Sequence, residues 1–282
     1  MGKFKEYILR KCSTKELEKL VIDRKIKETK NIYEKTFLRG IAYDFSIYYR
    51  EYGDKSEIKE HFKNVISNIE KHMIGISEKR QLCLLQSFRK IVTLHLASGN
   101  IANFIYDSNA EKRWLGFAIP DTYVNKNGNR VSISSDVEDV SLIDENIDVI
   151  EYLWNIERWE NHLSNHKIEG EPLKADLFVT EELPHYYPEL NLILAGGGCT
   201  HRTAEAYIHK RKGLAKVERY DISELIECVK TDGVNWINEI NNEPIGSEID
   251  DYRIAVIFTL RKMEKKLEKE ICDEKSVRTV CK

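Results

Sequence analysis

The side chains best suited to chemistry gather in one short stretch, residues 190–213, with the sequence LNLILAGGGCTHRTAEAYIHKRKG. An apolar run leads into three glycines, and a run with helical character follows them. A strand, a glycine turn and a helix in that order bring bare backbone N–H groups and a helix N-terminus to one point. Such a point binds anions, because unsatisfied amides and the helix dipole both face the ligand. The stretch therefore predicts a phosphate-binding loop at Gly196, Gly197 and Gly198.

Cationic side chains next to the glycines strengthen this prediction. His201 and Arg202 follow the turn, and arginine can hold a phosphate through two parallel hydrogen bonds. Lys210 lies in the run HKRK, one helix length further on, and adds local positive charge. A tight turn in which glycines only let a strand and a helix pack closely would show the same pattern. From spacing alone, both interpretations stay open.

Carboxylates and aromatic side chains occur shortly before the glycines. Glu181 and Glu182 could supply a general base or a Mg²⁺ ligand near the phosphates, because a loop between two strands of this domain faces the same end. His185, Tyr186 and Tyr187 could stack on a nucleobase. The alternatives are solvated loop carboxylates and rings that pack within a proline-bounded loop.

An acidic run lies between Asp136 and Glu151, where seven carboxylates occur without a matching base. Clustered carboxylates can hold Mg²⁺. The spacing fits no loop with a defined ligand order, however, so a solvated acidic surface is the preferred interpretation and no residue is assigned to a metal.

The elements that must position these residues follow from hydrophobic spacing. Ser13 and Glu16 form a capping box at the start of a first helix, and apolar periodicity predicts two more helices before residue 105. From Trp114 onward strands and helices alternate. The expected elements are short strands around the turn NKNGN, a helix over 148–166, strands over 175–179 and 191–195, a strand and a helix over 214–229, and a long helix over 247–276.

This order predicts an α+β fold in three parts. Residues 1–107 are expected to form a helical bundle domain, and residues 108–230 a small mixed-sheet domain. Residues 231–282 are expected to form C-terminal helices that pack back on the N-terminal domain.

The mixed-sheet part resembles the ParB/sulfiredoxin superfamily. GGGCTHRTAEAYIHKRKGLAKVERYDISEL follows that family's order of Gly-rich turn, His-Arg, small helical residues, a later Gly and a short strand. AIPDTYV resembles its opening Ile-Pro strand, and IEYLWNIERWENHL with EPLKADLFV resembles its helix and Pro-initiated strand. The resemblance covers roughly residues 114–230, and its distinctive part is the loop.

The resemblance implies nucleotide binding, because sulfiredoxins use ATP, ParB proteins use CTP, and related enzymes phosphorylate small substrates. By resemblance, the residues that cradle the phosphates would be Gly197, Gly198, Thr200, His201 and Arg202. Similar domains also act as nucleases and occur in bacterial and phage defence proteins, so a bacterial or phage origin is implied.

Cys199 is a candidate nucleophile by the same resemblance, because sulfiredoxins carry Gly-Gly-Cys-His-Arg at this place. A cysteine at a helix N-terminus beside an arginine has a lowered pKa and forms a nucleophilic thiolate. This chain has Thr200 inserted between Cys199 and His201, which puts threonine in the nucleophile's place. A small residue without a chemical role is the preferred interpretation of Cys199.

The leading expectation is a protein that binds a nucleoside triphosphate, ATP or CTP with or without Mg²⁺, and hydrolyses it or transfers a phosphoryl group. A ParB-like nuclease or DNA-binding protein is one alternative, favoured by HKRK and disfavoured by the net charge of −3. A non-catalytic module for a phosphate-bearing ligand is the other. The helical domain could bind a protein partner.

Composition limits the remaining classes. The chain has 32% charged residues, and no apolar run approaches the ~18 residues that a membrane span needs. Its six cysteines show no CxxC pair, which predicts neither a disulfide framework nor a zinc ribbon. With no signal peptide expected at the N-terminus, a reduced, cytoplasmic protein is the simplest interpretation.

Overall fold

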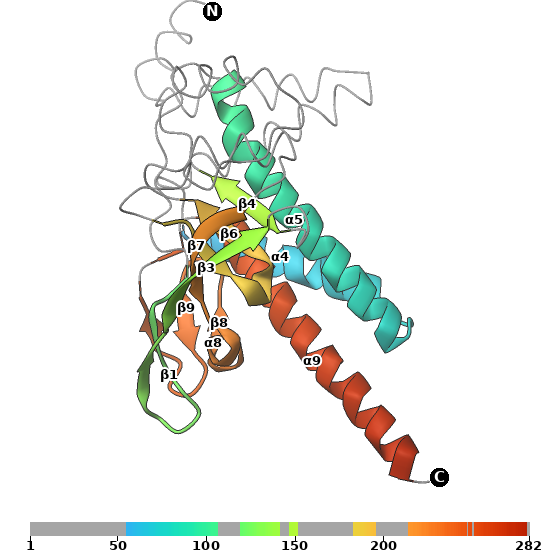
Figure 1. The fold of residues 1–282 in the computed structure, drawn as a ribbon. Coiled ribbons are helices and arrows are strands. Elements are labelled where there is room, and N and C mark those ends of the chain that lie inside the picture. The colour runs from blue at the N-terminus through green and yellow to red at the C-terminus, as the bar shows by residue number, and fades with distance from the viewer. Residues whose placement is uncertain are drawn as a thin grey trace, which may run out of the picture. The chain divides into compact units, whose positions relative to one another are not determined.

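The computed structural model describes residues 55–106, 119–141, 147–151, 183–195, 214–246, 248–249 and 251–280. Contacts within the chain divide it into two compact units, residues 1–54 and 55–282, and all the described residues belong to the second unit. This unit combines helices and sheets, which confirms the α+β class (Figure 1). The two described helices that precede residue 107, at residues 55–73 and 78–106, belong to the same unit as the strands, whereas the predicted division separated them.

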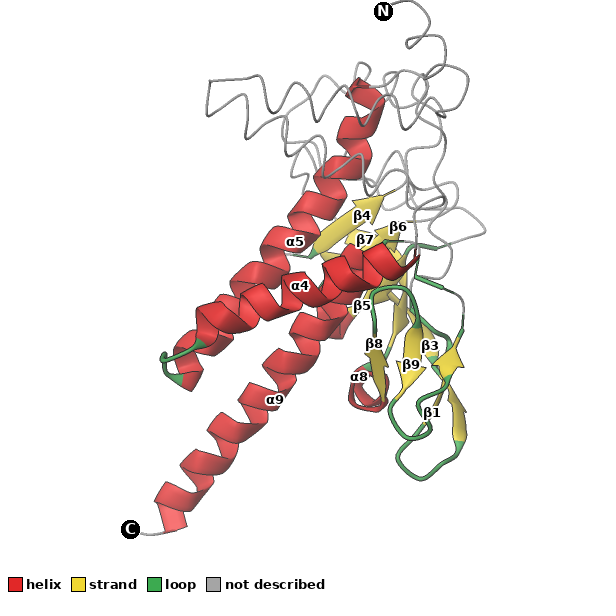
Figure 2. Cartoon of the chain, turned by 180° about the vertical axis from the view of Figure 1, so that it is seen from behind, coloured by secondary structure: helices red, strands yellow, loops and turns green. Residues whose placement is uncertain are grey.

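The long helices of the described unit are α4 (Lys55–Met73), α5 (Glu78–Tyr106) and α9 (Tyr252–Val280). α4 buries Phe62 and Ile69, which lie two helical turns apart and therefore on one face. α5 packs along α9, and α9 also contacts α4 (Figure 2). Residues 252–258 of α9 are buried on all sides, as expected for the part of a helix that other elements enclose.

A five-stranded sheet with the strand order β3-β7-β5-β6-β4 packs against α5 through its edge strand β4 (Figure 1). β4 and β6 are parallel, and so are β5 and β7, whereas β5 is antiparallel to β6 and β3 to β7. All five strands have buried positions, because Val140, Val149, Tyr187, Ile193 and Val217 are at most 2% exposed. The bounds are β3 Ser135–Ser141, β4 Asp148–Glu151, β5 His185–Tyr187, β6 Leu192–Ala195 and β7 Leu214–Tyr220.

The chain also forms two smaller sheets. β1 (Thr122–Val124) and β2 (Arg130–Ser132) form a hairpin, and β10 (Pro244–Ile245), β9 (Trp236–Asn238) and β8 (Val229–Thr231) form a three-stranded sheet after the short helix α8 (Ser223–Cys228). Asn238 is fully buried, and its side-chain amide donates to the carbonyl oxygen of Val124 at 2.7 Å. This hydrogen bond joins the hairpin to the three-stranded sheet.

Several predicted elements are confirmed. The helices before residue 105 that fall in the described residues, the hairpin around NKNGN, the strand over 191–195, and the strand and helix over 214–229 all form. The long helix at the C-terminal end forms as α9. The first predicted helix, near Ser13, and the strand over 175–179 lie outside the described residues.

Three predictions are wrong. The predicted helix over 148–166 begins instead as strand β4, because Val149 and Ile150 are buried in a sheet rather than on one side of a helix. The predicted loop before residue 191 contains β5 and the 3-10 helix η3 (Pro188–Leu190). The segment 231–282 is not helical throughout, since β9 and β10 lie in it.

Candidate functional site

The side chains predicted for the phosphate site lie outside the described residues. They are Glu181, Glu182, Gly196, Gly197, Gly198, Cys199, Thr200, His201, Arg202 and Lys210. The described strands nevertheless show where the segments that carry these residues begin and end.

One of these segments, residues 196–213, starts and finishes at the same edge of the large sheet. Gly196 is bonded to Ala195, the last residue of β6, and Gly213 is bonded to Leu214, the first residue of β7. β5 lies between these two strands, antiparallel to β6 and parallel to β7. β7 therefore starts at the edge where β6 ends.

The strands that flank the segment 152–182 also end and begin at this edge. The segment follows Glu151, the last residue of β4, whose register partner is Ala195 of β6. It leads into β5, whose first residue, His185, is the register partner of Leu194. Neighbouring strands are about 4.8 Å apart, so both segments leave the sheet side by side. We call this edge, where β4 and β6 end and β5 and β7 begin, the carboxyl edge.

A polar cluster lies on one face of the sheet next to the carboxyl edge. The Nε2 atom of His185 is 3.8 Å from the Oε2 atom of Glu218 on the neighbouring strand β7. The two side chains are 27% and 33% exposed, so solvent reaches both. The hydroxyl of Ser135 on β3 donates to the other carboxylate oxygen, Oε1, at 2.6 Å. A histidine beside a fixed carboxylate can accept and release a proton near neutral pH.

Two tyrosines complete this cluster. The ring of Tyr220 lies 4.9 Å from the imidazole of His185 and is stacked on Tyr187 at 5.5 Å, measured between ring centroids. Burial and a hydrogen bond to Glu218 raise the pKa of Tyr220 to about 12. Burial, with Tyr220 and Glu218 nearby, also raises the pKa of Tyr187. Both phenols therefore stay protonated at neutral pH, and Tyr220 acts as a hydrogen-bond donor to Glu218.

The sequence left open whether residues 185–187 stack on a nucleobase or pack within the protein, and their burial bears on this choice. Tyr186 and Tyr187 are only 7% and 2% exposed, which agrees with the packing interpretation. His185 keeps an exposed surface next to Glu218. Glu218 itself was not identified from the sequence, because the alternation of polar and apolar residues in AKVERY is typical of any half-buried strand.

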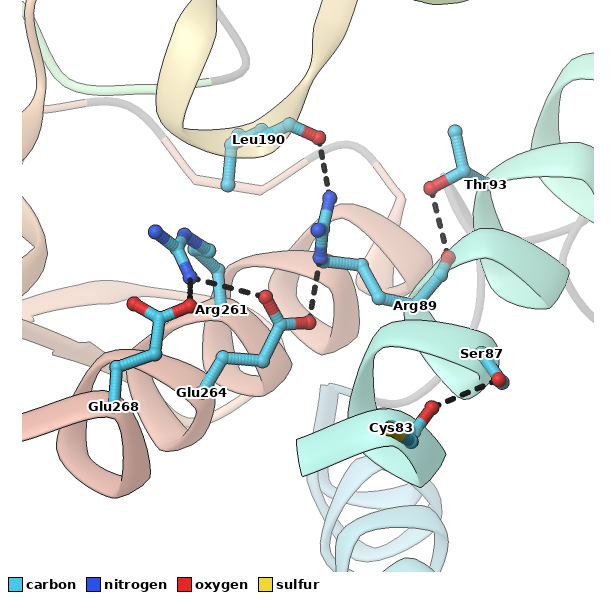
Figure 3. A network of polar contacts seen from close by, with 8 residues as sticks. All are labelled: Cys83, Ser87, Arg89, Thr93, Leu190, Arg261, Glu264 and Glu268. Atoms are coloured by element: carbon cyan, nitrogen blue, oxygen red, sulfur yellow. Dashed lines mark hydrogen bonds and ion pairs between the residues drawn. The ribbon is translucent and has the colours of Figure 1, made fainter. Parts of the chain in front are cut away.

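A second charged group lies at the opposite ends of β4 and β6, where these strands begin (Figure 3). Arg89 of α5 donates through Nε to the Oε1 atom of Glu264 in α9 at 2.7 Å, and through Nη1 to the carbonyl oxygen of Leu190 at 2.6 Å. The fully buried Glu264 also accepts from Arg261, which reaches Glu268 as well. Leu190 ends η3, immediately before the turn into β6.

The next residue of α5 holds β4 in the same way. Lys90 donates to the Oδ1 atom of Asp148, the first residue of β4, at 2.5 Å, and Asp148 is 4% exposed. The backbone N–H of Asp148 donates to the carbonyl oxygen of Asn191, just before β6. Asp148 therefore does not belong to a solvated acidic surface as predicted, and its matching base comes from a distant helix.

The His185 cluster and the Arg89–Lys90 contacts suit different roles. Ligands of parallel strands bind beyond the carboxyl ends, where loops and half-exposed side chains meet. Arg89 and Lys90 instead lie at the amino ends of the strands, and their side chains already bind carboxylates and a carbonyl group of the protein. We therefore assign them to holding the strands, and the carboxyl edge with His185 and Glu218 to the candidate site.

Within the described part of the chain, no group of three or more His, Cys, Asp and Glu side chains is arranged to hold a metal ion. Nor does any helix there combine the length and the apolar character needed to cross a membrane.

Comparison with known proteins corrects the predicted family. A family model described as "Family of unknown function (DUF6710)" matches residues 47–271, and no ParB or sulfiredoxin family matches, so the predicted resemblance is wrong. That resemblance depended on a short loop and its flanks, and one flank, the expected helix from Ile150, begins as a strand. No curated protein and no solved structure matches the chain. The matched residues include α4, α5 and the sheet and reach into α9, so the chain belongs to the DUF6710 family, a family of unknown function.

Proposed function

We propose that this protein binds the phosphates of a nucleoside triphosphate at the carboxyl edge and hydrolyses the nucleotide or transfers its phosphoryl group. One observation supports the proposal most directly. The two segments that carry the candidate phosphate ligands and the candidate carboxylates, residues 196–213 and 152–182, both leave and re-enter the sheet at this edge. The described strand ends that flank these two segments therefore lie at the same edge of the sheet.

The chemistry of the residues in these segments suits a polyphosphate. Glycines directly after β6 offer backbone N–H groups without side chains, and Arg202 with His201 offers charge-assisted hydrogen bonds to phosphate oxygens. Glu181 and Glu182 precede β5 by only a few residues and could hold Mg²⁺ beside the phosphates. An overall charge of −3 suits a small anionic ligand held in a local site better than a long nucleic acid.

Isothermal titration calorimetry of the full chain with ATP, CTP and GTP, each with and without Mg²⁺, tests this proposal. We expect heat of binding for at least one nucleotide. Arg202→Ala should weaken that binding at least tenfold, because a hydrogen bond to a charged group contributes about 1.5–3 kcal/mol, and should leave the melting temperature nearly unchanged.

Arg130→Ala is the matched control, since it removes an exposed arginine from the hairpin strand β2, outside the five-stranded sheet. It should bind the nucleotide as the unchanged protein does. The proposal fails if no nucleotide binds, or if Arg202→Ala and Arg130→Ala bind equally well.

A further inference from the structure

The His185–Glu218 pair joins two neighbouring strands next to the carboxyl edge, where the proposed reaction needs a proton acceptor. His185 is the first residue of β5, and its register partner Leu194 is two residues before Gly196. Each residue of a strand advances about 3.3 Å, so the position opposite His185 on β6 is roughly 7 Å, measured along the strand, before the start of the glycine segment. The pair is half-exposed and therefore open to a water molecule.

Glu218 is held in one orientation by two hydroxyl groups. Ser135 of β3 donates to Oε1 at 2.6 Å, and Tyr220 also hydrogen-bonds to this carboxylate. The remaining oxygen, Oε2, is the one that faces the imidazole. A carboxylate fixed in this way stabilises a positive charge on the neighbouring imidazole.

The same face also offers a cation nearer to the carboxyl edge. Lys216 is two residues before Glu218 on β7, so both side chains point to one face of the sheet. Its side chain is exposed, and its register partner on β3 is Asp139. An ammonium group between Glu218 and the edge lowers the repulsion that the carboxylate would exert on a bound phosphate.

We propose that His185 accepts the proton of the attacking water in the reaction at the carboxyl edge, and that Glu218 is its positioning residue. This inference rests on the proposed function. The O–H bond of the nucleophile breaks and its proton goes to the neutral imidazole, while the nucleophile's oxygen bonds to the terminal phosphorus. The bond from that phosphorus to the bridging oxygen breaks, and its electron pair leaves with the nucleoside diphosphate. The imidazolium then returns the proton to solvent.

The pH dependence of this step has a defined direction. Among the described residues, the titratable groups near His185 include Glu218 and Tyr220 of β7 and Tyr187 of β5. Lys216 and Asp139 lie further along the same face, and Asp121 acts on Tyr220. The tyrosines stay neutral at neutral pH. The rate should fall at low pH, because a protonated imidazole can no longer accept the proton of the nucleophile.

The test compares His185→Gln and Glu218→Gln with the unchanged full chain, with the nucleotide that binds most tightly in calorimetry as the probe. Release of inorganic phosphate is measured between pH 5 and 9. We expect His185→Gln to lower kcat by about 100-fold or more, within the range of general-base contributions. Glu218→Gln, which can still accept from Ser135, should lower kcat by about tenfold. Both variants should bind the nucleotide within about twofold of the unchanged chain, which also shows that they fold.

Glu138→Gln is the matched control, because it removes a carboxylate from the adjacent strand β3 but pairs with Arg219 on the other face of the sheet. It should leave kcat and the pH profile unchanged. If the unchanged chain binds nucleotide without releasing phosphate, or if His185→Gln keeps its kcat, the inference about His185 fails and the binding site stands. If no nucleotide binds at all, the proposed function fails and takes this inference with it.

Discussion

Gly233 lies between β8 and β9 in a backbone conformation, φ +90°, that side chains other than glycine rarely adopt. A Cβ atom at this position would come within 2.6 Å of the Cβ atom and 2.8 Å of the Cγ atom of Phe62. Phe62 is buried in α4, so it has little room to move away. The turn and the helix can pack this closely because position 233 has no side chain.

We therefore expect Gly233→Ala to lower the free energy of unfolding by about 2–4 kcal/mol, the sum of left-handed strain and overpacking. Gly128→Ala is the control, because Gly128 also has a positive φ, +79°, but nothing lies within 4 Å of its Cβ position. It should cost only about 1–2 kcal/mol. Urea unfolding measures both values, and equal losses would contradict the proposed close packing.

Asp232, one residue earlier, makes stability depend on pH. Burial alone would raise its pKa, but the ion pair with Lys59 and the hydrogen bonds from the backbone N–H groups of Asn235 and Val234 lower it below the ordinary value. A carboxyl group with a lowered pKa in the folded state stabilises the protein above its unfolded pKa of about 3.9, and this stabilisation is lost as the pH falls.

In Asp232→Asn, this contribution should be absent. The unchanged chain should exceed the variant in free energy of unfolding by a constant amount above about pH 5, and the difference should shrink below about pH 4. Urea unfolding at a series of pH values measures it. A difference that is the same at pH 6 and pH 3 would show that the carboxylate charge is not the cause.

At the scale of elements, α5 fixes the amino ends of β4 and β6 with two consecutive residues, and α9 supplies the counter-charge for one of them. Arg89 holds the carbonyl group before β6, Lys90 holds the first residue of β4, and Glu264 neutralises Arg89. The parallel register of the two strands sets where their carboxyl ends lie. The candidate site thus depends on helix contacts at the other end of the same strands.

Glu264→Gln should destabilise the chain by about 3–5 kcal/mol, because it leaves Arg89 and Arg261, each at most 17% exposed, without their shared buried carboxylate. Glu270→Gln removes a carboxylate on the same helix whose partner, Lys266, is 79% exposed, and should cost less than about 0.5 kcal/mol. Thermal and urea unfolding compare the two variants. Similar stabilities would show that the buried network contributes little.

The helices and the hairpin were predictable because their signals are local. Phe62 and Ile69 recur at helical spacing, and the turn NKNGN contains the glycine that its backbone requires. Strand β4 was mistaken for a helix because Val149 and Ile150 are buried by a partner strand more than 40 residues away, which local periodicity does not record. After the first turn of α5, Arg89 and Lys90 are its only Asp, Glu, Lys or Arg residues, and this isolated pair of charges was the available signal for their contacts with the strands.

The candidate site was predictable only in part for a related reason. Residue types and spacing directed attention to the glycine segment and to the carboxylates before His185. The pairing of β5 with both β6 and β7, which brings Glu218 beside His185, depends on strand order, and that order is not encoded in any short stretch. The family resemblance was wrong for a related reason, since a short loop pattern was extended over flanking elements, and the expected helix from Ile150 begins instead as a strand.

At the scale of the whole molecule, residues 55–282 form a compact unit of their own, and the family match covers nearly all of it. We expect a shortened chain of residues 55–282 to unfold in one cooperative transition, with a melting temperature within about 3 °C of that of the full chain. Differential scanning calorimetry provides the measurement. A broad transition, or a loss of more than about 10 °C, would show that residues 1–54 are needed for this unit to fold.

The packing of α5 against α9 also has a consequence during protein synthesis. The last residue of α5, Tyr106, and the first residue of α9, Tyr252, are separated by almost 150 positions in the chain. At about 5–20 residues per second, the ribosome needs roughly seven to thirty seconds to reach the second helix after the first. Throughout that interval α5 lacks the helix that it packs against in the folded chain, so the nascent chain presents apolar side chains of α5 to which chaperones can bind.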